Sequence, residues 1–118
     1  MIWDRIDKGL EHALAHDGTH DVRDVLQRIE RGEAQWWGAA DGVAITEVYC
    51  YPRKNFLNIW LVTGELDACL ALEPEIEAYA RERGCTELRT MSTRPGWLPI
   101  GKGRGWHEHS HQWVRALT

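Results

Sequence analysis

The part of the chain that most constrains the fold runs from residue 34 to 63, where apolar residues follow the pattern of strands. Asp41-Gly42 is a strong tight-turn dipeptide, and residues 52–55 form a second turn sequence. Three strand-like segments result: residues 34–39, 43–51 and 56–63. Because short turns join neighbouring antiparallel strands, these segments predict a three-stranded meander. We expect the third, the most apolar, to be central and buried on both faces.

Helical spacing flanks this meander. Apolar residues recur every three or four positions in three segments: residues 2–16, 22–29 and 66–83. Thr19 or Asp21 can cap the second helix, and Gly32 follows its end. Pro74 lies within the third segment, where it either kinks one helix or begins a second.

The last third of the sequence predicts two more strands. Residues 85–91 favour a strand parallel to the one before the crossover helix. Residues 93–105 hold four glycines and two prolines, so we expect a loop or a short broken helix. Residues 106–116 are expected to form the final strand. The order α-α-β-β-β-α-β-loop-β predicts a single mixed α/β (α+β) domain over residues 1–118.

Charge and hydropathy exclude several partners. The chain has 118 residues and a net charge of −4, so it has no general affinity for nucleic acid. Its longest strongly apolar run, residues 59–62, is far too short to cross a bilayer. The first residues lack the pattern of a signal peptide. We therefore expect a cytoplasmic protein that binds neither membranes nor nucleic acid.

Cysteines and tryptophans carry further expectations. Cys50, Cys69 and Cys85 form an odd set without paired spacing, which favours free thiols. Cys50 and Cys85 are expected to be buried rather than reactive. Seven tryptophans are many for so small a domain, and we expect some to form an exposed patch used for self-association or for binding another protein.

The element order and several short motifs together resemble the GNAT acyltransferase family. The likeness is greatest to small GNAT-like phage proteins, including internal virion proteins of short-tailed phages. The motifs are Thr46-Glu47-Val48, Tyr51-Pro52-Arg53, the strand ending at Gly64, Ile76–Ala80, Gly84-Cys85, Arg94-Pro95-Gly96-Trp97 and Gly103-Arg104-Gly105. The resemblance covers nearly the whole chain and implies a GNAT-like mixed sheet.

The resemblance also implies where acetyl-CoA or another acyl-CoA would bind. In active relatives the acyl donor lies between two parting strands, with its pyrophosphate on backbone amides at the start of the crossover helix. Contacts here would come from Val62, Gly64, Arg94, Gly96 and Trp97. The equivalent loop, residues 63–67, has one glycine, no basic residue and two carboxylates. Carboxylates at that point disfavour a pyrophosphate, so the sequence does not establish a cofactor; acetyl-CoA or another acyl-CoA is expected if the protein is an enzyme.

Two residues of the middle strand are candidate catalytic groups. Glu47 could serve as a general base toward an amine, and Tyr49, on the same face, could donate a proton. The alternative is that Glu47 pairs with Arg53 or an edge residue and that Tyr49 packs in the core or at its rim. Active relatives often use a tyrosine after the fifth strand as the acid, but no tyrosine follows Tyr79.

Two further motifs are open to two interpretations each. His107, His109 and His111 alternate along the expected last strand, so they could bind zinc, although a solvated or interfacial face is favoured. Arg94 could clamp a carboxylate or phosphate, or it could bond backbone carbonyls at a structural corner.

Two functions remain. The favoured one is a non-catalytic or degenerate GNAT-like protein that works by association, such as a virion, assembly or host-modulating factor. The alternative is an N-acyltransferase that moves an acyl group from acyl-CoA to an amine.

Overall fold

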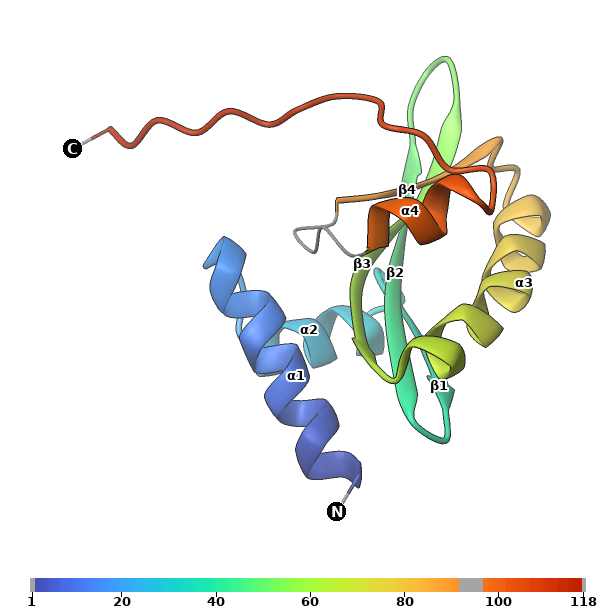
Figure 1. The fold of residues 1–118 in the computed structure, drawn as a ribbon. Coiled ribbons are helices and arrows are strands. Elements are labelled where there is room, and N and C mark those ends of the chain that lie inside the picture. Colours follow the sequence, from blue (N-terminus) through green and yellow to red (C-terminus); the bar gives the residue numbers. More distant parts are fainter. Residues whose placement is uncertain (1, 92–96, 118) are drawn as a thin grey trace.

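The computed structural model of the chain describes residues 2–91 and 97–117. Its helices are α1 (Ile2–Asp17), α2 (Val22–Glu30), α3 (Leu66–Glu82) and α4 (Trp97–Lys102). Its strands are β1 (Gln35–Ala39), β2 (Gly42–Cys50), β3 (Asn55–Gly64) and β4 (Glu87–Thr90). These bounds confirm the predicted helices and the first four predicted strands to within a few residues (Figure 1).

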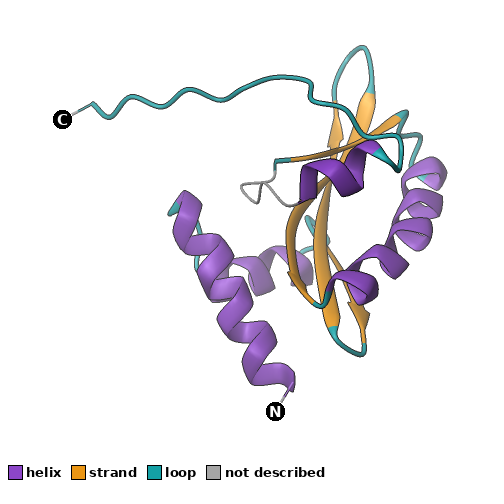
Figure 2. Cartoon of the chain, viewed as in Figure 1, coloured by secondary structure: helices purple, strands orange, loops and turns teal. Residues whose placement is uncertain are grey.

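The four strands form one mixed sheet in the order β1-β2-β3-β4. β1, β2 and β3 are antiparallel neighbours, as the meander predicts, and β4 pairs with β3 in parallel. The parallel pair follows from the crossover through α3. Figure 2 shows the sheet between two layers of helix, with α1 and α2 on one side and α3 on the other.

Each face of the sheet has its own apolar cluster. Leu10 and Leu14 of α1 and Val25 of α2 pack on Ile45 and Leu61 on the first face. On the second face Leu72, Ile76 and Ala80 of α3 pack on Ala44 and Leu57. β2 is the most buried strand, whereas β3 is mostly half-buried. The expectation that β3 is buried on both faces is therefore wrong along most of its length.

The helix ends follow local sequence signals. Asp21 caps α2. Its side chain accepts a hydrogen bond from the Asp24 amide at 2.8 Å, and the Asp24 side chain accepts one from the Asp21 amide at 2.9 Å. Pro74 lies inside one continuous helix, α3. Gly9 lets α1 cross close to β3, because a β-carbon there would overlap the Thr63 hydroxyl.

The predicted last strand is wrong. Residues 106–117 form neither helix nor strand, and residues 107–117 are all exposed. Figure 1 shows this segment leaving the body of the protein toward the C-terminus. An alternating sequence specifies an extended chain, but a strand also needs a paired neighbour, and this segment has none among the described residues.

Candidate functional site

β3 is paired with β4 over four residues and extends beyond them. Phe56 to Ile59 pair with Glu87 to Thr90, whereas β3 continues to Gly64 beyond the last paired residue. A register shift opposite Ile45 and Thr46 leaves Trp60 as an extra residue of β3. Trp60 and Leu61 consequently both pack toward the α1 and α2 side. The part of β3 beyond its pairing with β4 thus begins at a bulge.

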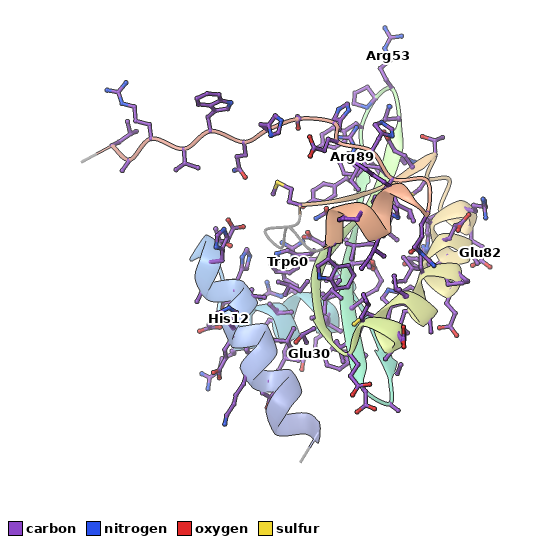
Figure 3. The ribbon with its side chains drawn as sticks, in the orientation of Figure 1. His12, Glu30, Arg53, Trp60, Glu82 and Arg89 are labelled. Atoms are coloured by element: carbon purple, nitrogen blue, oxygen red, sulfur yellow. The ribbon has the colours of Figure 1, made fainter. Side chains whose placement is uncertain are left out.

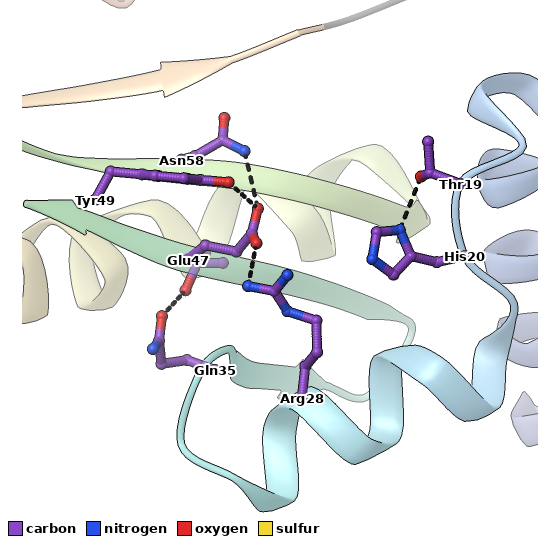
Figure 4. Close-up of polar contacts among 8 residues, drawn as sticks. Thr19, His20, Arg28, Gln35, Glu47, Tyr49 and Asn58 are labelled. Carbon is purple, nitrogen blue, oxygen red and sulfur yellow. Dashed lines mark hydrogen bonds and ion pairs between the residues drawn. The ribbon is translucent and has the colours of Figure 1, made fainter.

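The carboxylate of Glu47 is the centre of a polar network on the face of the sheet that α2 covers. Arg28 of α2 lies 2.7 Å from Glu47 Oε2. The Tyr49 hydroxyl and the Asn58 amide donate to Glu47 Oε1 at 3.1 and 3.3 Å. Figure 4 shows these three donors converging on one side chain. Glu47 is 4% exposed, so nearly all of its hydration is replaced by these contacts.

Aromatic rings extend this network. The Arg28 guanidinium lies 5.4 Å from the centre of the Trp60 ring, and His20 meets the same ring edge-on at 4.8 Å. On the other side Tyr49 stacks with Tyr51 and Phe56. The pKa of Tyr49 is raised above 10.0, first by burial and then by the negative charge of Glu47. Tyr49 therefore stays protonated at neutral pH and serves as a donor to Glu47.

This arrangement makes Glu47 a poor general base. A base needs a free lone pair within reach of the proton that it removes. Both oxygens of Glu47 already accept from donors, and one of these donors is the Arg28 guanidinium. The predicted alternative, an ion pair, fits the geometry, although the partner is Arg28 of α2 rather than Arg53 or an edge residue. Arg53 lies at the tip of the β2–β3 hairpin and is exposed (Figure 3).

The start of α3 is the second part of the site. Gly64 has φ +119, and a side chain there would overlap the Asp41 carbonyl. The Glu65 amide donates to that same carbonyl at 2.8 Å. The β1–β2 turn thus lies against the entrance to α3 and takes one of the amides that an anion would use.

The side chains at this entrance are acidic. Glu65 is the N-cap residue, its side chain makes no cap hydrogen bond, and both Glu65 and Asp67 are exposed. Val62, which the resemblance places near the acyl donor, is half-buried in the apolar cluster under α3. Residues 62–67 therefore do not fit a pyrophosphate well, because two full negative charges flank the remaining amides.

The segment after β4 supplies fewer of the expected contacts. Arg94 and Gly96 lie outside the described residues, so the two interpretations of Arg94 stay open. Trp97 begins α4 and is half-buried. Arg104 lies 3.1 Å from Glu73 of α3, and the Trp106 ring nitrogen donates to the same carboxylate at 3.4 Å. Glu73 thereby fixes the chain after α4 against α3.

The histidines and cysteines of the sequence analysis do not form a site. His107, His109 and His111 are exposed on a segment that is not a strand, which removes the basis for placing them on one face. No group of three potential metal ligands gathers within the described ranges. Cys50 is exposed, so the expectation that it is buried is wrong. Burial raises the pKa of Cys85, which keeps its thiol neutral.

The network around Glu47 contains residues that the sequence analysis did not single out. Arg28 follows Val25 by three positions, which places it beside the buried stripe of α2 and was a usable signal. Asn58 faces Glu47 in the register of β2 and β3. No sequence signal identifies Asn58 or His20, because their roles depend on strand register and on how α2 is placed over the sheet.

Most of the described tryptophan side chains are partly covered. Trp36, Trp37, Trp60, Trp97 and Trp106 are all half-buried, whereas Trp113 is 92% exposed. Among the described helices, none has the length and apolar character that crossing a bilayer requires.

Comparisons with known proteins place the fold. No protein-family model and no curated protein sequence matches this chain. A probable acetyltransferase superposes with a TM-score of 0.70 at 11% identity, over 98% of this chain and 91% of the other. A ribosomal-protein-alanine N-acetyltransferase from Brucella melitensis biovar Abortus 2308 superposes with a TM-score of 0.65 at 14% identity, over 98% and 95%.

A third solved structure, a predicted acetyltransferase with acetyl-CoA from Clostridium acetobutylicum, superposes with a TM-score of 0.66 at 12% identity. It covers 98% of this chain and 91% of that one. Together with the mixed sheet, these likenesses show that the chain has the GNAT acyltransferase fold. Because every identity is low, they establish the fold and leave activity to be argued from the residues.

Proposed function

We propose that this GNAT-fold protein acts by binding another protein and does not transfer acyl groups from coenzyme A. The observation that carries the proposal is the entrance to α3. Its Glu65 amide donates to the Asp41 carbonyl, and Glu65 and Asp67 leave it acidic. An anion binds at a helix N-terminus through free backbone amides, and negatively charged side chains beside those amides repel it.

The Glu47 network supports the same proposal. Catalysis of acyl transfer to an amine requires a group that accepts the amine proton. Glu47 is enclosed by Arg28, Tyr49 and Asn58, which suits a structural carboxylate. The resemblance to small phage proteins suggests the finer form of the proposal, a virion, assembly or host-modulating role.

Acetyl-CoA binding is the direct test. We expect the melting temperature of the full chain to stay unchanged by millimolar acetyl-CoA, whereas a ligand at a hundred times its Kd stabilises by about 2.7 kcal/mol. A saturable rise in melting temperature that the pyrophosphate-free analogue acetyl-pantetheine does not reproduce would contradict the proposal.

A charge variant sharpens this test. Two unit charges about 5 Å apart in water interact by about 0.8 kcal/mol, so each carboxylate weakens anion binding by about 4-fold. Glu65→Gln with Asp67→Asn should therefore bind acetyl-CoA better than the unchanged chain. The matched control is Glu75→Gln with Glu82→Gln, which removes two exposed charges farther along α3. Equal binding by both double variants would show that the α3 entrance is not what limits coenzyme binding.

One observation favours the alternative function, an N-acyltransferase with acyl-CoA as donor. β3 extends beyond its four pairs with β4, at the place where the family holds its acyl donor, and one structural neighbour is reported with acetyl-CoA. Release of free coenzyme A from acetyl-CoA in the presence of primary amines would support this function. Turnover that Glu47→Gln abolishes would assign the base as well.

A further inference from the structure

The C-terminal tail, residues 107–117, is the most exposed apolar segment that the structure describes. Trp113, Val114 and Leu117 are 92%, 86% and 95% exposed. These three make up a large share of the strongly exposed apolar side chains, which also include Leu26, Tyr51, Leu66 and Met91. Large apolar side chains left in water mark a surface that becomes covered on association.

The tail also has the sequence of a strand. Odd-numbered positions from 107 to 113 are aromatic or imidazole side chains, and even-numbered positions from 108 to 112 are polar. This alternation suits a strand that lies on a sheet with two different faces. His111 lies 3.7 Å from Glu108 of the same segment, so that contact does not tie the tail to the body.

The sheet has an edge that such a strand would complete. β4 is the last strand of the sheet within the described ranges, and it pairs on one side with β3. The Thr86 amide donates to Asn55 of β3, so by alternation Glu87 and Arg89 direct their backbone groups outward. An edge strand with outward amides and carbonyls is a template for another strand.

The tail is held at its start and extends from the body of the protein (Figure 1). The Trp106 amide donates a hydrogen bond to the Gly101 carbonyl, and the Trp106 ring N–H donates to the Glu73 carboxylate. From this anchor the tail runs away from the body (Figure 1). Residues 107–117 contain no Gly, Pro, Asn or Asp, and Ser110 is their one residue of a type common in turns. A segment so poor in turn residues favours an extended chain over one that folds back on itself.

We propose that the tail of one copy adds to β4 of a second copy, and that the exchange is reciprocal. The interaction is main-chain pairing of a strand to a sheet edge, with alternate side chains entering the two faces. Reciprocal exchange closes a two-fold dimer and leaves no free tail, which an open chain of copies would not achieve. This inference needs no coenzyme site and is independent of the proposed function.

The faces of the sheet at β4 suit this occupant. On the face that Phe56 shares, Arg89 lies 4.0 Å from the Phe56 ring, and Tyr51 stacks on that ring. An added strand whose odd-numbered side chains share the face of Phe56 would bring His111 and Trp113 to the side of these rings and Val114 to the face of Leu88, which packs against the cluster under α3. Aromatic side chains thus meet aromatic ones, and aliphatic ones meet aliphatic ones.

The test is the mass of the full chain in solution, measured by light scattering and sedimentation from micromolar to millimolar concentration. We expect a dimer whose dissociation constant rises at least 10-fold in Trp113→Ser with Val114→Ser. The matched control, Leu26→Ser with Leu66→Ser, removes two exposed apolar side chains from α2 and α3 and should leave the dimer intact. A monomer at millimolar concentration would overturn the proposal, and so would a dimer that both double variants preserve.

A proline separates strand pairing from simple apolar contact. Gln112→Pro removes one tail amide without removing an apolar side chain, and it should weaken the dimer, whereas Gln112→Ala should not. Hydrogen exchange gives the location: amides of residues 108–116 and of Glu87 and Arg89 should gain protection as the dimer forms. Protection of the tail amides in a monomer would place the strand in its own chain and overturn the exchange.

Discussion

Glu47 and Glu65 are the same chemical group in two opposite settings. Glu47, in the middle of β2, is buried and accepts from Arg28, Tyr49 and Asn58. Glu65, at the entrance to α3, is exposed and its side chain makes no cap hydrogen bond. The buried carboxylate is fixed and contributes to folding, whereas the exposed one keeps its charge in water and repels anions. The candidate catalytic carboxylate, Glu47, is thus taken up by structural contacts, and the helix start that could hold a cofactor pyrophosphate is acidic.

The largest effect should come from breaking the buried ion pair. Arg28→Met leaves the Glu47 carboxylate buried without its cation, and we expect a loss of about 3 kcal/mol in the free energy of unfolding. The value lies at the low end of such losses because the Arg28 side chain is 31% exposed. Arg23→Met, an exposed arginine of the same helix, should change stability by less than about 0.5 kcal/mol. Urea denaturation measures both, and equal losses would remove the distinction between the two carboxylate settings.

Gly64→Ala should have the next largest effect on stability, and it would disturb the entrance to α3, where Glu65 lies. Its φ of +119 and its contact with the Asp41 carbonyl leave no room for a methyl group, so we expect a loss of about 2 kcal/mol. Gly18→Ala is the control, since Gly18 also has positive φ, at +69, but has open space around it. Its loss should be about 1 kcal/mol. Thermal unfolding of the two variants would show whether the turn against α3 is as tight as the structure indicates.

Glu47→Gln compared with Glu65→Gln tests the contrast directly. The first should cost about 1.5 kcal/mol, less than Arg28→Met because Arg28 can regain water. The second should stay within about 0.5 kcal/mol. Glu47→Gln should also lower the pKa of Tyr49, since the Glu47 charge is the second cause of its upward shift.

The pH dependence of that variant has a definite sign. A tyrosine whose folded pKa is raised contributes stability that is fully present below its unfolded value near 10. That stability is lost as the pH rises through the folded value. The alkaline loss should be smaller in Glu47→Gln, and an ultraviolet titration that finds an unchanged Tyr49 would contradict the assigned cause.

The smallest effect belongs to Glu87, a half-buried carboxylate of β4 with two basic partners. Hydrogen bonds from Lys54 and then Arg89 lower its pKa from 4.5 to about 2. Its contribution to stability is present above pH 4.5 and is lost as the pH falls through about 2. Lys54→Met should return the pKa toward 4.5, and Lys8→Met should not. Carboxyl chemical shifts followed by NMR would decide this.

Most of the elements could be predicted because their signals are local. Val22, Val25 and Ile29 form a helical stripe wherever the helix packs, and Asp21 caps it through neighbours three residues away. The parallel pairing of β4 with β3 followed from the helix between them. Pro74 could not be settled from sequence, because packing of α3 on the sheet decides whether the helix continues past it.

The candidate site was less predictable. Glu47 and Tyr49 were placed on one face correctly, since alternation is local. The partner of Glu47 was predicted as Arg53, which follows the same strand, or as an edge residue, but it is Arg28 from a helix earlier in the chain. The final strand failed for a related reason, because a strand is completed by a neighbour that the segment itself does not specify.

The sequence by itself determined the first three helices and the first four strands to within a few residues, the acidic character of the α3 entrance and the alternating pattern of the tail. Each of these depends on residues within a few positions of one another. The tertiary structure decided that Arg28 neutralises Glu47, that the Asp41 carbonyl takes the Glu65 amide, and that β4 is left as an edge. These contacts join residues far apart in the chain, and they form because burial of the two apolar clusters sets how the layers sit on one another.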